Sequence, residues 1–199
     1  LNLPRNPRDY TSIAVTTDDS NDEIVYASSM GDGVIQYKNG TPVQSYNEKN
    51  AFKETAGGYG SGYCYIDGLA FDKNGNLWMT SSEVNHAVLV LDKAGAWHRL
   101  DIEQLRGVYT INDILITSTN DKWIYVPRNT PKLVMIPNSE SLDEVSSYEF
   151  TTLIDTDGKE LTPSNYTCVA EDKDGYIWVG TNRGAVYFTK PRICSAEDK

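Results

Sequence analysis

Short apolar runs alternate with short polar turns along the chain, and this pattern occurs four times in the 199 residues. Each unit opens with two runs rich in β-branched residues, separated by a turn of Asn, Asp or Gly. Such pairs of runs predict β-hairpins, here over residues 12–27, 68–80, 113–126 and 168–180. No stretch has a convincing helical period, and only residues 103–106 are expected to form a single helical turn.

The turns of these hairpins align in one column. It reads Asn21-Asp22, Asn74-Gly75, Asn120-Asp121 and Asp174-Gly175. A two-residue type I′ turn needs positive φ at both central residues, which Asn, Asp and Gly tolerate, so we expect type I′ turns here. In this alignment Val25, Trp78, Ile124 and Trp178 form a second column, at steps of 53, 46 and 54 residues. That spacing is the size of a propeller blade.

Further apolar runs extend each hairpin into a sheet. They fall at residues 34–37 and 43–46, 87–91 and 97–102, 133–137 and 147–153, and 185–189. Four antiparallel strands, A to D from the inside out, cannot bury both faces of their sheet alone, so such sheets stack face to face around an axis. The sequence therefore predicts an all-β fold, a β-propeller of four blade-like repeats. We expect one domain over residues 1–199, with repeats at about 10–51, 66–103, 111–154 and 166–190.

The fourth unit has no obvious outer strand, and four blades rarely close a ring. Two explanations remain open. Residues 1–10 complete the last blade, or, as we favour, the chain is part of a larger propeller. Open ends expose apolar faces and strand edges that favour association. We therefore expect either a homodimer through open propeller ends or closure of the last blade by the chain's own N-terminus.

Charge and composition narrow the range of partners. The formal net charge of −10 makes nucleic acid and bare membrane surfaces poor partners. The longest purely apolar run, residues 87–91, is far too short for a membrane span. The three cysteines, Cys64, Cys168 and Cys194, lack a metal-binding spacing and allow at most one intramolecular disulfide.

No enzyme motif stands out in the sequence. The two histidines, His86 and His98, lie in no metal-binding or nucleophile motif. The Asp-rich turns resemble the start of a calcium loop but lack the Glu that closes an EF-hand at its twelfth position. We therefore expect no catalytic residue, no metal and no cofactor, while a propeller lyase or hydrolase remains a less favoured reading.

Two segments carry a recognisable signature. Residues 72–79 and 172–181 share the pattern Asp-x-[Asn/Asp]-Gly-x-[Leu/Ile]-Trp-[Met/Val], which resembles the two-component regulator propeller repeat. The resemblance implies the periplasmic sensor region of a hybrid histidine kinase of the Bacteroidetes type, which responds to glycan fragments. Residues 69–80, with the long segments between units, are also similar to PorZ-like propeller proteins. That resemblance implies a cell-surface component of type IX secretion that handles lipopolysaccharide.

The long connections between units are the expected binding face. In a propeller the D–A connections and B–C loops share one end of the blades, and long loops on a rigid scaffold often bind ligands. The Tyr and Arg residues on this face suit recognition. The expected ligand-binding residues are Tyr59, Tyr63, Arg106, Tyr109, Arg128, Tyr166 and Arg183.

The function expected from these features is non-enzymatic binding. We expect the ligand-sensing region of a two-component signalling system, which binds a glycan or a small anion, in the periplasm or at the cell surface of a Gram-negative bacterium. The alternative is a PorZ-like secretion component that binds lipopolysaccharide or partner proteins.

Overall fold

The computed structural model describes residues 9–52, 62–143, 145–154 and 157–189. These residues form antiparallel strands and a single 3-10 turn, η1 (Glu103–Leu105), where the sequence predicts one. The chain divides into two compact units, Leu1–Ile114 and Leu115–Lys199. Each is described by itself.

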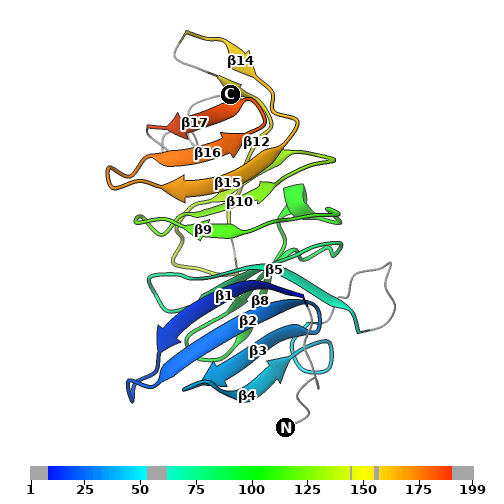
Figure 1. The fold of residues 1–199 in the computed structure, drawn as a ribbon, viewed down its shortest axis with the longest axis vertical. Coiled ribbons are helices and arrows are strands. Elements are labelled where there is room, and N and C mark those ends of the chain that lie inside the picture. The colour runs from blue at the N-terminus through cyan, green and yellow to red at the C-terminus, as the bar shows by residue number, and fades with distance from the viewer. Residues whose placement is uncertain (1–8, 53–61, 144, 155–156, 190–199) are drawn as a thin grey trace. The chain divides into compact units, whose positions relative to one another are not determined.

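The first unit contains two four-stranded, blade-like sets of strands (Figure 1). The first set is β1 (Tyr10–Thr17), β2 (Glu23–Gly31), β3 (Gly33–Lys38) and β4 (Thr41–Tyr46). The second is β5 (Cys64–Phe71), β6 (Leu77–Ser81), β7 (Val88–Leu91) and β8 (Trp97–Leu100). Each strand pairs with the next along the chain, so the strands take the places A to D that the sequence predicts. Tyr10 pairs with Ser29 in the first set. Residues 1–8, part of the segment that the less favoured explanation uses to complete the last blade, lie outside the described residues.

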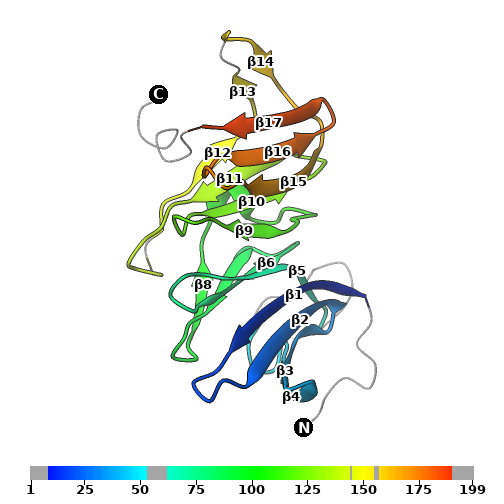
Figure 2. The same cartoon turned by 60° about the vertical axis from the view of Figure 1, so that its left-hand side comes forward.

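The second unit contains a four-stranded and a three-stranded sheet. The strands are β9 (Ile114–Ile116, which begins at the end of the first unit), β10 (Lys122–Val126), β11 (Lys132–Ile136) and β12 (Tyr148–Phe150), then β15 (Tyr166–Glu171), β16 (Ile177–Thr181) and β17 (Gly184–Phe188). Among the described residues the last sheet has no outer strand, as expected. A short hairpin of β13 (Leu153–Ile154) and β14 (Glu160–Leu161), which the sequence does not predict, lies outside the β15–β17 sheet in both views (Figure 2).

Each unit has a core between its two sheets. In the first, aromatic rings from successive sheets meet edge to face, Tyr26 with Phe71 at 5.8 Å and Tyr46 with Trp97 at 5.4 Å between ring centroids. In the second, Trp123 lies 5.1 Å from Phe188. Burial of these side chains, rather than strand propensity alone, holds the sheets face to face.

The hairpin turns are not type I′. Only one residue in each has positive φ: Asn21 (62°), Gly75 (84°), Asn120 (67°) and Gly175 (82°). Each forms a type I turn followed by this left-handed residue, a common hairpin connection. The expected geometry does occur at Asn39-Gly40, where both φ angles are positive and Lys38 pairs with Thr41.

The repeat register also differs from the prediction. The turns begin at Asp18, Asp72, Thr117 and Asp172, whose backbone N–H groups bond to the residue four positions on. Six residues after these positions stand Ile24, Trp78, Trp123 and Trp178. The expected column of Val25 and Ile124 is wrong by one residue, because Asn fills the left-handed position in the first and third turns where Gly does in the others. In the third blade Trp123, and not Ile124, therefore takes the repeat position of Trp78 and Trp178.

The hydrogen bonds of the first turn residue explain why Asp and Trp recur six residues apart. Asp72 accepts the backbone N–H groups of Asn74 and Asn76 through Oδ1, and the indole Nε1 of Trp78 through Oδ2 at 2.9 Å. Asp172 does the same for its own turn, with Trp178 Nε1 at 2.7 Å. One carboxylate thus fixes both the turn and the following Trp. This is why the spacing recurs.

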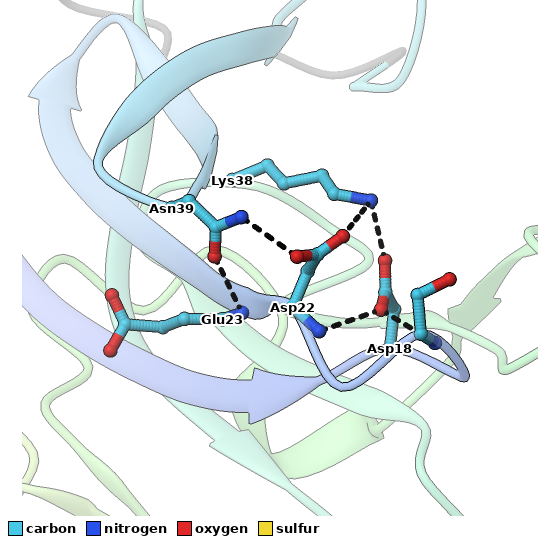
Figure 3. Close-up of polar contacts among 6 residues, drawn as sticks. Asp18, Asp22, Glu23, Lys38 and Asn39 are labelled. Atoms are coloured by element: carbon cyan, nitrogen blue, oxygen red, sulfur yellow. Dashed lines mark hydrogen bonds and ion pairs between the residues drawn. The ribbon is translucent and has the colours of Figure 1, made fainter.

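The turn end of the first blade uses its polar groups internally (Figure 3). Lys38 Nζ lies 2.7 Å from Asp18 Oδ2 and 2.8 Å from Asp22 Oδ2, and Asn39 donates to Asp22. The bond from Lys38 and those from the turn backbone hold the pKa of Asp18 below its usual value. The A–B and C–D turns are therefore tied to each other.

The next two blades repeat this tie. Asn76 Oδ1 accepts the backbone N–H of Lys93, and Asp121 Oδ1 accepts that of Asn138. In the first three blades the A–B turn is therefore bonded to the C–D turn.

Candidate functional site

The opposite end of each blade, where strand A starts and strand B ends, is the expected binding face, called here the loop end. In both units the end of a B strand bonds to the start of the next blade's A strand. Met30 pairs with Tyr65 in the first unit, and Pro127 O accepts Tyr166 N at 3.0 Å in the second. These ties hold the loops of neighbouring blades at a fixed spacing.

Tyr63 and Tyr65 lie side by side at the loop end of the first unit. Their rings meet edge to face at 6.4 Å, and Gly31, with φ of 116°, leaves room for Tyr63, since a Cβ there would come 3.0 Å from its ring. Burial, and then the charges of Asp9, Asp32 and Glu83, raise the pKa of Tyr63. Tyr59, the other tyrosine expected in this segment, lies outside the described residues.

Arg106 and Tyr109 follow η1 in the same unit. The Arg106 guanidinium is paired with Asp101 through two bonds of 2.6 and 2.5 Å, so its charge is already compensated. Tyr109 is 57% exposed. Of these two expected ligand-binding residues, Tyr109 offers the more open surface.

Asp67 is a residue of this face that the sequence reasoning missed. Its carboxylate accepts the Ser82 hydroxyl at 2.7 Å, and Ser82 Oγ in turn accepts the backbone N–H of Ile111 at 2.8 Å. Burial, with a further contribution from Asp113, raises the pKa of Asp67 to about 7, although the Ser82 bond opposes the shift. The sequence signal that could have identified Asp67 is an acidic residue directly before the buried segment that begins at Gly68.

Glu83 adds to the acidic character of this end. It has a positive φ of 63°, and its buried Oε1 accepts no hydrogen bond from the described residues. Together these tyrosines and carboxylates offer aromatic faces and hydrogen-bond acceptors. That combination suits hydroxyl-rich groups and disfavours anions.

The second unit has a different loop end. Arg128 and Arg183 are exposed on its two B–C loops. Tyr166 is fully buried in the core, where burial raises its pKa to about 12, and its hydroxyl has no hydrogen-bond partner among the described residues. The neighbouring Asn165 also has a buried, unpartnered Oδ1. The structure therefore leaves Arg128 and Arg183 exposed on two loops that bond to either side of the Asn165–Tyr166 segment, while the Tyr166 side chain is buried.

The described residues hold no group of three or more His, Cys, Asp or Glu arranged for a metal ion. His98 is half-buried, and its Nε2 lies 3.0 Å from Asp92 Oδ2. Cys64 and Cys168 are free thiols, Cys64 being buried, and Cys194 lies outside the described residues. None of the helical structure described is long and apolar enough to cross a bilayer.

Comparison with known proteins supports the repeat assignment. Residues 160–183 match the family described as two component regulator propeller. No curated protein matches the sequence. Among solved structures, PorZ of Porphyromonas gingivalis, an essential surface component of the type-IX secretion system, superposes with a TM-score of 0.82 at 18% identity, over 94% of this chain and 26% of PorZ.

Two further structures have the same fold. The extracellular domain assigned to a hybrid two component system of B. thetaiotaomicron has a TM-score of 0.62 at 13% identity, over 94% of this chain and 22% of that one. Virginiamycin B lyase of Staphylococcus aureus has a TM-score of 0.54 at 13% identity, over 94% and 72% of the two chains. The chain spans about a quarter of the length of PorZ and of the two component domain.

At these identities the structural matches show the fold alone, and that fold is shared by a secretion-system surface component, an extracellular two component domain and an enzyme. The predicted all-β propeller architecture is confirmed, with the described strands forming part of a propeller. The resemblance inferred from the signature is confirmed as well, since the matching residues include the Asp172 turn and Trp178. The chain is a partial β-propeller that carries a two component regulator propeller repeat.

Proposed function

We propose that this chain is a non-enzymatic, extracytoplasmic recognition propeller, the ligand-sensing region of a two-component signalling system. The observation that carries the proposal is the contrast between the two ends of the blades. The A–B and C–D turns of the turn end are tied to each other by an ion pair and hydrogen bonds, whereas the loop end carries the exposed side chains of Tyr109, Arg128 and Arg183. Exposed polar and aromatic groups on a rigid scaffold are what a recognition surface requires.

The family match and the fold of an extracellular two component domain support this reading. The same comparisons favour a periplasmic or cell-surface location in a Gram-negative bacterium of the Bacteroidetes type. A glycan is the favoured ligand, because the loop end of the first unit combines tyrosines with hydrogen-bond acceptors. A non-enzymatic role is part of the proposal, since enzymes also use this fold.

A second candidate rests on the TM-score of 0.82 with PorZ. In that case the chain is a surface component of a type IX secretion system, and its loop end binds lipopolysaccharide or a partner protein. A homodimer through open propeller ends is compatible with either role.

Binding of the 199-residue chain to an immobilised glycan array, which includes lipopolysaccharide, tests the proposal. A retained ligand is then titrated against Tyr109→Ala in the first unit and Arg183→Ala in the second. We expect at least one of these variants to weaken binding about tenfold, which corresponds to roughly 1.4 kcal/mol.

Lys93→Ala and Lys173→Ala serve as matched controls, because both lysines are exposed on the A–B or C–D turns at the opposite end of the blades. Control variants that weaken binding as much as the loop-end variants would place the surface elsewhere. Turnover of a bound glycan by the chain would overturn the non-enzymatic part of the proposal.

A further inference from the structure

We infer that the loop end of the first unit binds a polyamine, an aliphatic chain that carries a primary ammonium group at each end. In this site Asp32 and Glu83 receive the two ammonium groups, and tyrosine rings lie against the methylene chain. The inference goes beyond the proposed function, because an amine belongs to another chemical class than the glycan expected there. It is carried by two carboxylates on segments at a fixed spacing, by the tyrosines around them, and by a buried carboxylate oxygen that lacks a hydrogen-bond donor.

The two carboxylates lie on segments at either side of the start of β5. Asp32 forms a β-bridge with Cys64, the first residue of that strand. On the other side, Tyr65 O accepts the backbone N–H of Ser82 at 3.3 Å, and Glu83 follows Ser82. Three backbones therefore run side by side, and at about 4.8 Å for each spacing the backbones of Asp32 and Glu83 are about 10 Å apart. A chain with a cation at each end spans such a gap.

The Glu83 segment is also tied on its far side. Glu83 donates its backbone N–H to Val108 O at 2.8 Å, and Gly107 donates its own to Val84 O at 2.8 Å. These bonds bring Tyr109, which follows Val108, next to the same segment. Loops that are held by backbone bonds lose little conformational entropy when a ligand binds.

Tyrosine side chains supply the apolar part of the site. Tyr63 and Tyr65, on the middle segment, meet edge to face with 6.4 Å between their ring centroids, and Tyr109 is 57% exposed. Burial raises the pKa of Tyr65, and smaller contributions come from Asp67, Tyr63, Glu83 and Tyr109. The three phenol groups and Glu83 are therefore close enough to interact. Aromatic rings cover methylene groups and attract a cation that lies over their faces.

One buried carboxylate oxygen in the site lacks a donor. Glu83 Oε1 is buried and accepts no hydrogen bond from the described residues, and none of the ion pairs among these residues includes Glu83 or Asp32. A buried acceptor without a donor is costly, and the cost is larger for a charged group. A primary ammonium group supplies an N–H donor and the opposite charge together, which a neutral sugar hydroxyl does not.

A single metal ion fits this arrangement less well. Calcium and magnesium gather several oxygen ligands within about 2.6 Å. The part of the chain that the structure describes holds no group of three or more His, Cys, Asp or Glu so arranged. Two carboxylates on separate segments, with tyrosines on the segment between them, instead match a chain that is charged at its ends and apolar in the middle.

The test compares hexamethylenediamine with hexamethonium, its fully N-methylated form, which keeps the methylene chain and both charges but has no N–H group. Calorimetric titration of the 199-residue chain at low salt is expected to show the diamine bound about tenfold tighter, because hexamethonium cannot donate to Glu83 Oε1. Glu83→Gln and Asp32→Asn should each weaken diamine binding about tenfold, since each removes the charge that receives one ammonium group. Asp19→Asn, which removes an exposed carboxylate from the A–B turn of the same unit, should change the affinity less than about twofold.

The outcomes that would overturn the inference are distinct. Equal binding of the two dications, or full binding by either Glu83→Gln or Asp32→Asn, would overturn it. Magnesium chloride that displaces the diamine at an equal concentration would show a general attraction for cations and would overturn it too, as would absence of diamine binding at millimolar concentration. A variant whose circular dichroism differs from that of the parent chain is left out, and the other of the two then decides. Glycan binding is measured independently on the array, so failure of the amine site leaves the proposed function as it stands.

Discussion

At the scale of single residues, Tyr166 has a buried hydroxyl group that forms no hydrogen bond with the described residues. The side chain is fully buried, and no described residue bonds to its Oη. An unsatisfied buried hydroxyl costs about 1–3 kcal/mol, so Tyr166→Phe should raise the free energy of unfolding by about 1 kcal/mol. Urea denaturation with an unchanged slope would show it. A loss of stability instead would mean that the hydroxyl has a partner, such as an ordered water.

Asp67 makes stability depend on pH. Its pKa is raised to about 7 in the folded chain, against an ordinary value near 4. The folded state therefore binds this proton more tightly, and the stability that protonation gives is lost as pH rises from about 4 to about 7. Asp67→Asn keeps an acceptor for Ser82 and removes the buried charge. It should stabilise the chain by about 1–2 kcal/mol at pH 8, after allowance for partial exposure, and have little effect at pH 4.

Thermal unfolding at the two pH values measures the difference. Asp113→Asn is the useful comparison, because Asp113 contributes to the raised pKa of Asp67 through its charge. It should shift the same pH dependence by a smaller amount. A stabilisation by Asp67→Asn that is equal at both pH values would show that titration of Asp67 is not its cause.

At the scale of single elements, we expect the carboxylate of the first turn residue to contribute more to the free energy of unfolding in one blade than in another. Trp78 is 1% exposed and Trp178 is 40% exposed, although both donate to an Asp six residues earlier. Replacement by Thr copies the third blade, where Thr117 Oγ1 still accepts the backbone N–H of Asp121. Asp72→Thr should lower the free energy of unfolding by about 1.5–3 kcal/mol, because buried Trp78 loses its charged acceptor.

Asp172→Thr should have a smaller effect, since water can replace the carboxylate at the exposed Trp178 indole. Comparison of the two variants by urea denaturation measures burial of the Trp together with the bond from Asn76 Nδ2 to Asp72 Oδ2, because Tyr176 stands in place of Asn76 in the last blade. Equal losses would mean that the Asp matters through the turn amides and not through the Trp.

The sequence predicts most elements because each depends on local chemistry. Apolar runs and Asn, Asp or Gly turns locate the strands of all four blades. The turn type and the repeat register are harder to predict from the sequence. Either Asn or Gly can occupy the left-handed position of the turn, and an alignment that treats them as different positions places Val25 and Ile124 in the wrong column. The hairpin of β13 and β14 has an Asp157-Gly158 pair between its strands, but each strand has only two residues and does not stand out as an apolar run.

The candidate site is less predictable than the fold. Loop position indicated Arg128 and Arg183 correctly as surface residues, but the pairing of Arg106 with Asp101 depends on how the chain turns after η1. The bonds from Pro127 to Tyr166 and from Asn165 to Asn182 join residues far apart in the sequence, and no periodic pattern records them. The burial of Tyr166 follows from the same long-range packing.

At the scale of the whole molecule, the outer face of the last sheet is where we expect association. Tyr187 stacks on Trp178 at 4.8 Å and on Tyr176 at 5.8 Å, and all three rings are exposed among the described residues. Trp123, which occupies the place of Trp178 in the third blade, is instead covered by Phe188 of the next sheet. The last sheet thus exposes a face of the kind that the repeat buries elsewhere.

An exposed aromatic sheet face favours association, so the 199-residue chain should dimerise at micromolar concentration. Trp178→Glu should weaken the association at least tenfold, because a charge cannot be buried against a second apolar face without a partner. Ile154→Glu is the matched control, since Ile154 is an exposed apolar residue of the same unit outside this sheet. Sedimentation velocity over a range of concentrations measures both. A chain that stays monomeric throughout, or a dimer that Trp178→Glu leaves intact, would show that this face does not mediate association and that the aromatic rings are stable in water as they stand.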